Sequence, residues 1–118
     1  MKVYGLGLKG EMAAKRYLKK KGFKILKTNY QCRFGELDLI AMDKDCLVFC
    51  EVKTRSEGMI AAPYESVTYA KRQKMIKTAS FFLQEHQSFL NSRFDVVSIM
   101  VQKDGQMQIE HLENVFSC

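Results

Sequence analysis

Residues 35–54 read Gly-Glu-Leu-Asp-Leu-Ile-Ala-Met-Asp-Lys-Asp-Cys-Leu-Val-Phe-Cys-Glu-Val-Lys-Thr, and the rest of the chain is organised around them. Two apolar, β-prone runs, 37–42 and 46–52, flank a polar tip at 43–45. This pattern predicts a β-hairpin. Three charged residues, Asp38, Glu51 and Lys53, interrupt the runs or close them. A charge inside such a run is costly unless it is paired or bound to a metal.

The length of the turn determines which charged residues face each other. A loop of two or four residues places Asp38 opposite Glu51 and Glu36 opposite Lys53, whereas a three-residue loop would break this register. Opposed Cβ atoms lie about 4.5–5.5 Å apart, so two carboxylates there favour a bound cation or a raised pKa. Because side chains alternate between faces, the opposite face should be apolar: Leu37, Leu39, Ala41, Val48, Cys50 and Val52. The alternative is a surface salt-bridge cluster at a sheet edge.

Length and composition indicate one soluble globular domain spanning residues 1–118. The chain is 47% hydrophobic and 27% charged, which is ordinary for such a domain. No apolar run approaches the roughly 18 residues that a membrane span needs. The N-terminal segment runs quickly into charged sequence and lacks the apolar centre of a signal peptide. We therefore expect a cytoplasmic protein that does not bind membranes.

Basic residues are concentrated in two segments. The chain has 19 Lys and Arg against 13 Asp and Glu, a net charge of +6. Residues 12–35 contain eight basic residues and no acidic one: Lys15, Arg16, Lys19, Lys20, Lys21, Lys24, Lys27 and Arg33. The second segment holds Lys71, Arg72, Lys74 and Lys77. Such patches attract nucleic acid, mostly through its phosphates, but they also occur as solvated helix faces. Charge alone favours neither interpretation.

The cysteines and histidines give no sign of a zinc site. Cys46 and Cys50 have the spacing of a zinc pair, but on a strand they would lie roughly 13 Å apart. With Cys32 and Cys118 they fit small apolar residues of a reducing compartment. His86 and His111 are isolated in the sequence, and we assign them no chemistry.

The remaining periodicity predicts the element order α-β-β-β-α-β-β. Helices are expected at 6–21 and 67–90, strands at 23–32, 94–101 and 107–112, and a loop at 54–66. At 100° per residue, Glu11 shares the apolar face of the first helix with Ala14 and Leu18, and Lys71 projects near the apolar stripe of the second. Strands interspersed with helices imply a central mixed sheet with helices on its faces.

Glu11, Asp38, Glu51, Lys53 and Lys71 are the candidate site residues. Carboxylates that converge with a lysine suit a hard, oxygen-preferring cation such as Mg²⁺ or Mn²⁺. Such an ion polarises a phosphodiester and activates water, while a lysine neutralises charge that builds on phosphorus.

Asp38 followed by Glu51-Val-Lys53 resembles the signature of the PD-(D/E)xK nuclease superfamily. The likeness to the YraN-like family of small bacterial proteins, similar in turn to archaeal Holliday-junction resolvases, covers nearly the whole chain. It is carried by Gly10-Glu-x-x-Ala-x-x-Tyr-Leu18, Gly22, Gly35-Glu-Leu-Asp-Leu-Ile-Ala41, Phe49-Cys-Glu-Val-Lys-Thr-Arg55, Val67, Lys71 and Arg93-Phe-Asp-Val-Val97. Cys50 replaces the commoner valine. Ala61-Ala62 stands where glycine is more usual, which leaves the conformation of that loop open.

This resemblance implies a three-layer α/β/α, restriction-endonuclease-like fold and endonuclease activity on DNA, including branched or damaged forms. It implies Glu11, Asp38, Glu51 and Lys53 as the catalytic set, with Glu11, Asp38 and Glu51 around Mg²⁺ or Mn²⁺. We expect substrate contacts from Lys71, Arg55, Lys19 and Lys20, and a homodimer is compatible with the resemblance. A non-catalytic nucleic-acid-binding module and a protein–protein adaptor are the alternatives. The intact Asp38, Glu51 and Lys53 set favours the nuclease.

Overall fold

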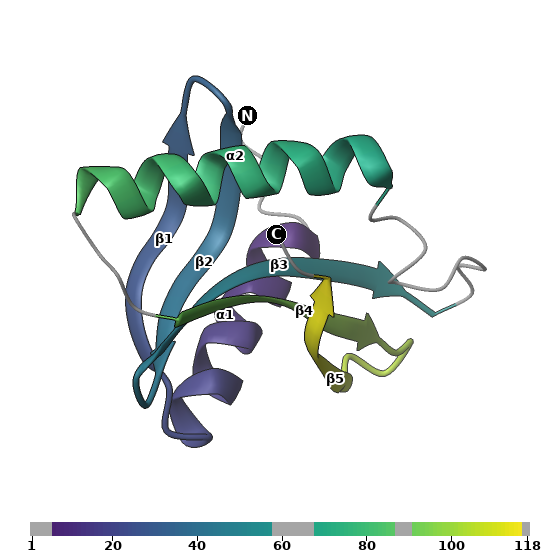
Figure 1. The fold of residues 1–118 in the computed structure, drawn as a ribbon. Helices are drawn as coiled ribbons and strands as arrows, with labels where there is room; N and C mark the ends of the chain where they lie inside the picture. Colours follow the sequence, from purple (N-terminus) through teal and green to yellow (C-terminus); the bar gives the residue numbers. More distant parts are fainter. Residues whose placement is uncertain (1–5, 58–67, 87–90, 117–118) are drawn as a thin grey trace.

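The computed structural model describes residues 6–57, 68–86 and 91–116, and its elements follow the predicted order (Figure 1). The elements are α1 (Leu6–Lys20), β1 (Lys24–Cys32), β2 (Gly35–Asp43), β3 (Cys46–Ser56), α2 (Tyr69–Glu85), β4 (Asn91–Val101) and β5 (Met107–Phe116). No helix among these residues is long and apolar enough to cross a membrane.

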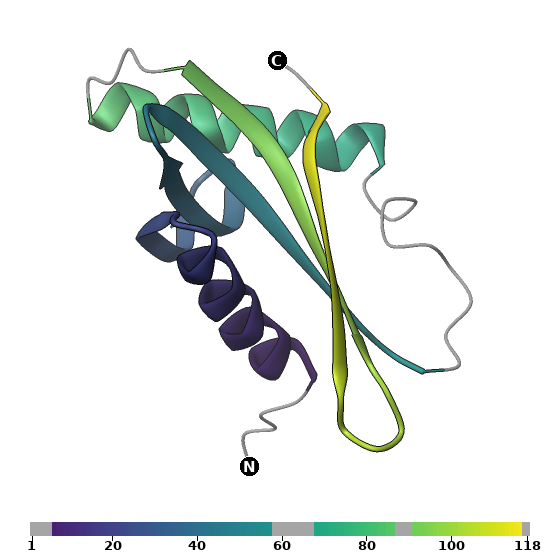
Figure 2. The same ribbon diagram turned by 90° about the horizontal axis from the view of Figure 1, so that it is seen from below.

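The five strands form one sheet in the order β1-β2-β3-β4-β5. Strands β3 and β4 are parallel, and the other neighbours are antiparallel. A parallel pair needs a long crossover connection, and α2 lies in it. Helix α1 packs on one face of the sheet and α2 on the other (Figure 2). The predicted α/β class, with a mixed sheet between two helical layers, is confirmed.

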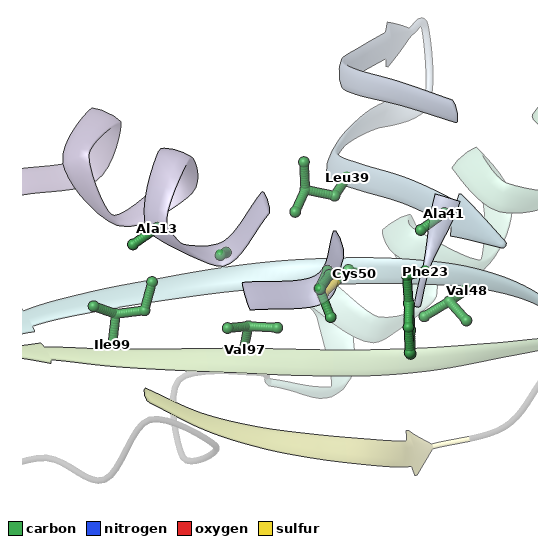
Figure 3. Close-up of a cluster of buried hydrophobic side chains, with 10 residues drawn as sticks. Ala13, Phe23, Leu39, Ala41, Val48, Cys50, Val97 and Ile99 are labelled. Carbon is green, nitrogen blue, oxygen red and sulfur yellow. The ribbon is translucent and has the colours of Figure 1, made fainter. Parts of the chain in front are cut away.

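Each face of the sheet has its own apolar core. The α1 side, shown in Figure 3, buries Ala13, Ala14, Leu18, Phe23, Leu39, Ala41, Val48, Cys50, Val97 and Ile99. The α2 side buries Leu37, Ile40, Leu47, Phe49, Met75, Ala79, Phe82, Phe94 and Val96. Alternation along β3 sends Val48 and Cys50 to one core and Leu47 and Phe49 to the other. Both faces of the central strands are therefore apolar until the site residues begin.

Two glycines determine where α1 lies. Gly22 has φ 99°, a conformation that favours glycine, and the N–H of Phe23 donates to the carbonyl of Leu18 at 3.0 Å. The helix therefore ends as predicted. At the other end, Gly10 faces β3 so closely that a Cβ atom there would overlap the Thr54 side chain. This close approach brings the first turns of α1 next to the end of β3.

Strand β3 is longer than the sequence predicts. The predicted loop was to start at residue 54, yet Thr54, Arg55 and Ser56 pair with Ile99, Met100 and Val101 of β4. Pairing with the parallel strand β4 extends β3 here, and no pattern in the local sequence predicts that pairing. Similarly, β4 begins at Asn91 and β5 continues to Phe116. Helix α2 is shorter than the predicted 67–90, because Thr68 caps its start and His86 its end. Residues 58–67 and 87–90, which include the rest of the predicted loop, lie outside the described residues.

A buried polar network ties β5 to β4 and to the end of α1. Asp95 is fully buried, accepts from Arg93 Nε at 3.0 Å and from the Asn114 N–H at 3.0 Å, and meets His111 Nε2 at 2.7 Å. The other His111 nitrogen, Nδ1, lies 2.8 Å from Lys21 Nζ. Burial alone would raise the pKa of Asp95, but these hydrogen bonds outweigh it and lower the pKa. His111 therefore has a structural role that its isolation in the sequence hid.

Candidate active site

The predicted register of the hairpin is correct around its tip. The loop is the two-residue Lys44-Asp45, and Ile40 pairs with Phe49 as expected. Beyond the pair formed by Leu39 and Cys50, however, β2 and β3 are no longer paired. The predicted backbone pairing of Asp38 with Glu51 and of Glu36 with Lys53 is therefore not formed, although the Glu51 charge still acts on Asp38. Instead, Asp38 Oδ2 accepts a hydrogen bond from the Val52 N–H at 2.8 Å.

The alternation of side-chain faces along β2 is interrupted at Asp38. Leu39 packs in the α1-side core and Leu37 in the α2-side core, although residues two apart on a regular strand share a face. The prediction that both face the same side is therefore wrong. The neighbouring strand β1 is distorted at the same level, because Asn29 has φ 52° and lies between the paired residues Thr28 and Tyr30. The β2–β3 pair consequently opens into a fork at Asp38.

Helix α2 and strand β3 place two lysines on one carboxylate beside this fork. Lys71 Nζ donates to Glu51 Oε2 at 2.6 Å, and Lys53 Nζ lies 3.3 Å from the same oxygen. The Glu51 side chain is only 10% exposed, so both contacts are partly screened from water. We call Asp38, Glu51, Lys53 and Lys71 the acid–lysine cluster. The predicted inward projection of Lys71 from α2 is confirmed.

The cluster perturbs the ionisation of Asp38. Burial raises the pKa of Asp38 to about 6, repulsion from Glu51 adds to the rise, and the Val52 N–H opposes it. Glu11 contributes a smaller repulsion and Lys71 a smaller attraction. A carboxyl group raised by burial and by a like charge is a common feature of functional sites, although structural ion-pair networks produce it too.

The pKa values of the two lysines are shifted in opposite directions. Burial lowers the pKa of Lys53, and the neighbouring Lys71 adds to this against the attraction of Glu51. Burial also acts to lower the pKa of Lys71, but the hydrogen bond to Glu51, the contact with Lys53 and the attraction of Glu51 and Asp38 together outweigh burial and raise the pKa. Of the two ammonium groups, Lys71 is therefore the one held more firmly by Glu51.

Glu11 lies near the fork but apart from the ion pairs. Its Oε1 accepts a hydrogen bond from Asn29 Nδ2 at 3.0 Å, and its charge is felt at Asp38. In the part of the chain that the structure describes, no three acidic, histidine or cysteine side chains are gathered closely enough to hold a metal ion. Glu11, Asp38 and Glu51 thus surround one region without forming a closed coordination sphere.

Of the other predicted substrate contacts, Arg55 is largely buried, and Lys19 and Lys20 lie away from the cluster. Arg55 is 8% exposed, so its side chain offers little surface to a substrate. Lys19 and Lys20 are exposed at the C-terminal end of α1. They lie about 12 Å along the helix from Glu11. The structure therefore brings together Asp38, Glu51, Lys53 and Lys71, with Glu11 beside them, buries Arg55, and leaves Lys19 and Lys20 outside.

Comparison with known sequences gives a match that covers most of the described fold. The family model described as "Uncharacterised protein family UPF0102" matches residues 10–99, from Gly10 on α1 to Ile99 on β4. The chain belongs to the UPF0102 family. This confirms the YraN-like resemblance at the level of the family.

Individual UPF0102 proteins match almost end to end. The chain is 46% identical to the UPF0102 protein of Syntrophomonas wolfei over 112 residues, which cover 94% of this chain and 96% of the relative. The identity is 44% with the UPF0102 protein of Geobacter metallireducens, covering 94% and 91% of the two chains. It is 42% with that of Nocardia farcinica, covering 94% and 88%. The family match over residues 10–99 therefore spans the positions of the acid–lysine cluster.

The sequence analysis missed two hydrogen-bond donors at this candidate site. Asn29 holds Glu11, and the Val52 N–H holds Asp38. Asparagine is one of the few residues that adopt positive φ readily, so an asparagine inside a predicted strand could have signalled the distortion at Asn29. A backbone N–H carries no sequence signal at all.

A groove adjoins the acid–lysine cluster. It has a volume of about 430 Å³ and is lined by Lys71, Lys74 and Met75 of α2 and by Gln31, Cys32, Gly35 and Glu36 of the β1–β2 hairpin. Another hollow, of about 460 Å³, lies against β5 and is lined by Arg72, Leu112 and Phe116 among others, but by no residue of the cluster. Of these two hollows, the first adjoins the cluster, because Lys71 belongs to both.

Proposed function

We propose that this protein is a metal-dependent nuclease that hydrolyses phosphodiester bonds of DNA in the cytoplasm, including branched or damaged DNA. The observation that carries the proposal is the acid–lysine cluster, in which two carboxylates and two lysines meet where β2 and β3 separate. This combination supplies both ligands for a divalent cation and positive charge for a phosphate.

Asp38 and Glu51, with Glu11 beside them, are the residues that would hold Mg²⁺ or Mn²⁺. Their oxygen donors suit a hard cation, and the pKa of Asp38 is raised first by burial and then by repulsion from the Glu51 carboxylate. When bound, such an ion would polarise the phosphate and lower the pKa of a coordinated water. Two or three carboxylates suffice for Mg²⁺, because this ion usually retains several waters.

The two lysines of the cluster would stabilise the negative charge of the phosphate. Lys53 and Lys71 approach Glu51 from a strand and a helix, so their ammonium groups are fixed before substrate arrives. Negative charge on the phosphate oxygens grows during hydrolysis, and fixed cations stabilise it more than flexible ones do. Asp38 is itself fixed by the Val52 N–H, which keeps one carboxylate oxygen oriented.

Substitution of Lys53 and Glu51 tests the chemistry. We expect Lys53→Ala to lower cleavage by roughly a hundredfold or more while DNA binding changes little, because many other lysines contact phosphates. Glu51→Ala should lower cleavage similarly by removing a metal ligand. The measurement is cleavage of junction, flap, nicked, single-stranded and RNA substrates with Mg²⁺ or Mn²⁺. Lys103→Ala, in the exposed β4–β5 turn, is the matched control and should cut like wild type.

A non-catalytic nucleic-acid-binding module is the second candidate. It is favoured by one observation, that Glu51 is already neutralised by two lysines and so needs no metal. If folded wild type binds DNA but cuts no substrate of the panel with either metal, this module replaces the nuclease. The same conclusion follows if both variants cut as fast as wild type.

A further inference from the structure

The tip of the β1–β2 hairpin lies directly on α2, next to the acid–lysine cluster. A Cβ atom at Gly35 would lie 3.1 Å from Thr78 Oγ1, so the backbone of the tip touches the helix. Beside it, Phe34 packs edge-on against Phe81 of α2, with ring centroids 5.9 Å apart. The tip is therefore anchored on the helix and divides the surface along it into two hollows.

These two hollows follow the length of α2. The first is the groove of about 430 Å³ that begins at Lys71 of the cluster. The second, of about 400 Å³, lies on the other side of the tip and is lined by Arg33, Phe34, Lys77, Ser80, Phe81 and Gln84 together with Ile76. From Lys71 to Gln84 they extend about 20 Å along the helix. We call them together the hairpin–α2 surface.

The charge of the hairpin–α2 surface is positive. Among its described lining residues the cations are Arg33, Lys71, Lys74 and Lys77, and the acid is Glu36. The Gln31 amide donates to Glu36 at 3.2 Å. Lys74 and Lys77 are exposed, so their ammonium groups are available to a polyanion. A chain of phosphates fits this distribution of charge.

The second hollow adds an aromatic wall to the cations. Phe34 and Phe81 are both partly exposed, and the guanidinium of Arg33 lies 4.9 Å from the centre of the Phe34 ring. Aromatic rings and guanidinium planes are the groups on which unpaired bases stack. The bases of an intact duplex are already stacked on each other and cannot use such a wall.

We propose that the hairpin–α2 surface binds an unpaired strand of nucleic acid next to the phosphate at the acid–lysine cluster, with a base stacked at Phe34. This inference rests on the proposed function for the identity of the polymer, and it assigns to the substrate a single-stranded segment beside the cleaved bond. Lys74 and Lys77 contact the phosphates of that segment. An acidic polypeptide would use the cations but not the aromatic wall.

A tryptophan probe tests the stacking directly. The chain contains no tryptophan, so Phe34→Trp gives a single fluorescent reporter at the wall. In EDTA, so that no cleavage occurs, we expect an oligo-dT to quench its emission. An abasic oligonucleotide of equal length, the matching duplex and poly-glutamate should not. Gln106→Trp, in the exposed β4–β5 turn, is the control probe and should not respond to oligo-dT.

Binding by two further variants measures the contribution of the surface. Phe34→Leu keeps an apolar side chain against Phe81 and should weaken oligo-dT binding roughly tenfold while duplex binding stays the same. Lys77→Gln should weaken oligo-dT binding several-fold, whereas Lys103→Gln should not. Thermal unfolding confirms that each variant is folded, and Lys77→Gln tests the proposal if Phe34→Leu does not fold.

The outcomes separate this inference from the nuclease proposal. Equal quenching by abasic DNA or by duplex, quenching by poly-glutamate, or unchanged oligo-dT binding by Phe34→Leu and Lys77→Gln would overturn the single-strand assignment. Cleavage that depends on Lys53 and Glu51 would leave the nuclease intact in that case. Conversely, stacking at Phe34 without any cleavage would support the surface and overturn the nuclease.

Discussion

Asp38 is a candidate site residue whose ionised side chain also destabilises the folded protein. Its carboxylate is partly buried, faces the charge of Glu51, and is held by the Val52 N–H. Burial and repulsion raise the pKa of Asp38 from 3.8 to about 6. The folded state therefore prefers the protonated carboxyl. This preference stabilises the fold below pH 3.8 and is lost as the pH rises through about 6.

Asp38→Asn should therefore stabilise the protein at neutral pH in EDTA. The amide oxygen can still accept from the Val52 N–H, but the unfavourable charge is gone. We expect a gain of about 1–2 kcal/mol at pH 7, after allowing for partial exposure of the group. Chemical denaturation at several pH values measures it, and the gain over wild type should disappear toward pH 4.

Glu36→Gln is the control for this prediction, because Glu36 is an exposed carboxylate two residues away on the same strand. It should change stability by less than about 0.5 kcal/mol. A loss of stability in Asp38→Asn at pH 7 would show that the ionised carboxylate is stabilising and that the cluster is a structural salt-bridge network.

At the scale of elements, the packing of α1 on β3 decides where Glu11 lies. The first turns of the helix approach the strand where Gly10 meets Thr54, and a Cβ atom at position 10 finds no room. Glu11 is the next residue, so its distance from Asp38 depends on this contact. The site is thus assembled by helix–sheet packing rather than by the hairpin alone.

Gly10→Ala should destabilise the protein by about 1–3 kcal/mol, because the added methyl group overlaps a β-branched side chain. Denaturant unfolding measures the loss, and Thr54→Ala should relieve part of it in the double variant. Gly7→Ala is the matched control. A Cβ at Gly7 meets nothing within 4 Å, so alanine there should leave stability unchanged or raise it by up to about 1 kcal/mol. Equal effects of the two substitutions would contradict the close packing of α1.

At the scale of the whole molecule, two groups of positive charge lie apart from each other. Lys19 and Lys20 are exposed at one end of α1, whereas Lys74 lies in the groove beside Lys71 of the acid–lysine cluster. Lys21, although next to this pair in sequence, is held by His111.

We predict that DNA affinity falls steeply with salt, because phosphate contacts release bound counterions. Replacing both Lys19 and Lys20 by alanine should weaken duplex binding for all sequences alike and reduce the log–log salt slope by up to about 2. Fluorescence anisotropy from 50 to 200 mM salt measures this, with Lys103→Ala as the control. Lys21 is left unchanged so that the His111 network stays intact. An affinity that does not vary with salt would contradict a phosphate-binding role.

The sequence by itself determined the element order, the mixed α/β class, the register at the hairpin tip and the direction of Lys71 toward the sheet. These follow from local periodicity, because the alternation of strands and the 3.6-residue repeat of helices are written in neighbouring residues. Only the tertiary structure decided the fork at Asp38, the extension of β3 along β4, and the distance of Lys19 and Lys20 from the cluster. A strand's length and bends depend on partners far away in the chain. The break opposite Asn29 and the contact of Gly10 with Thr54 are therefore invisible to any local pattern.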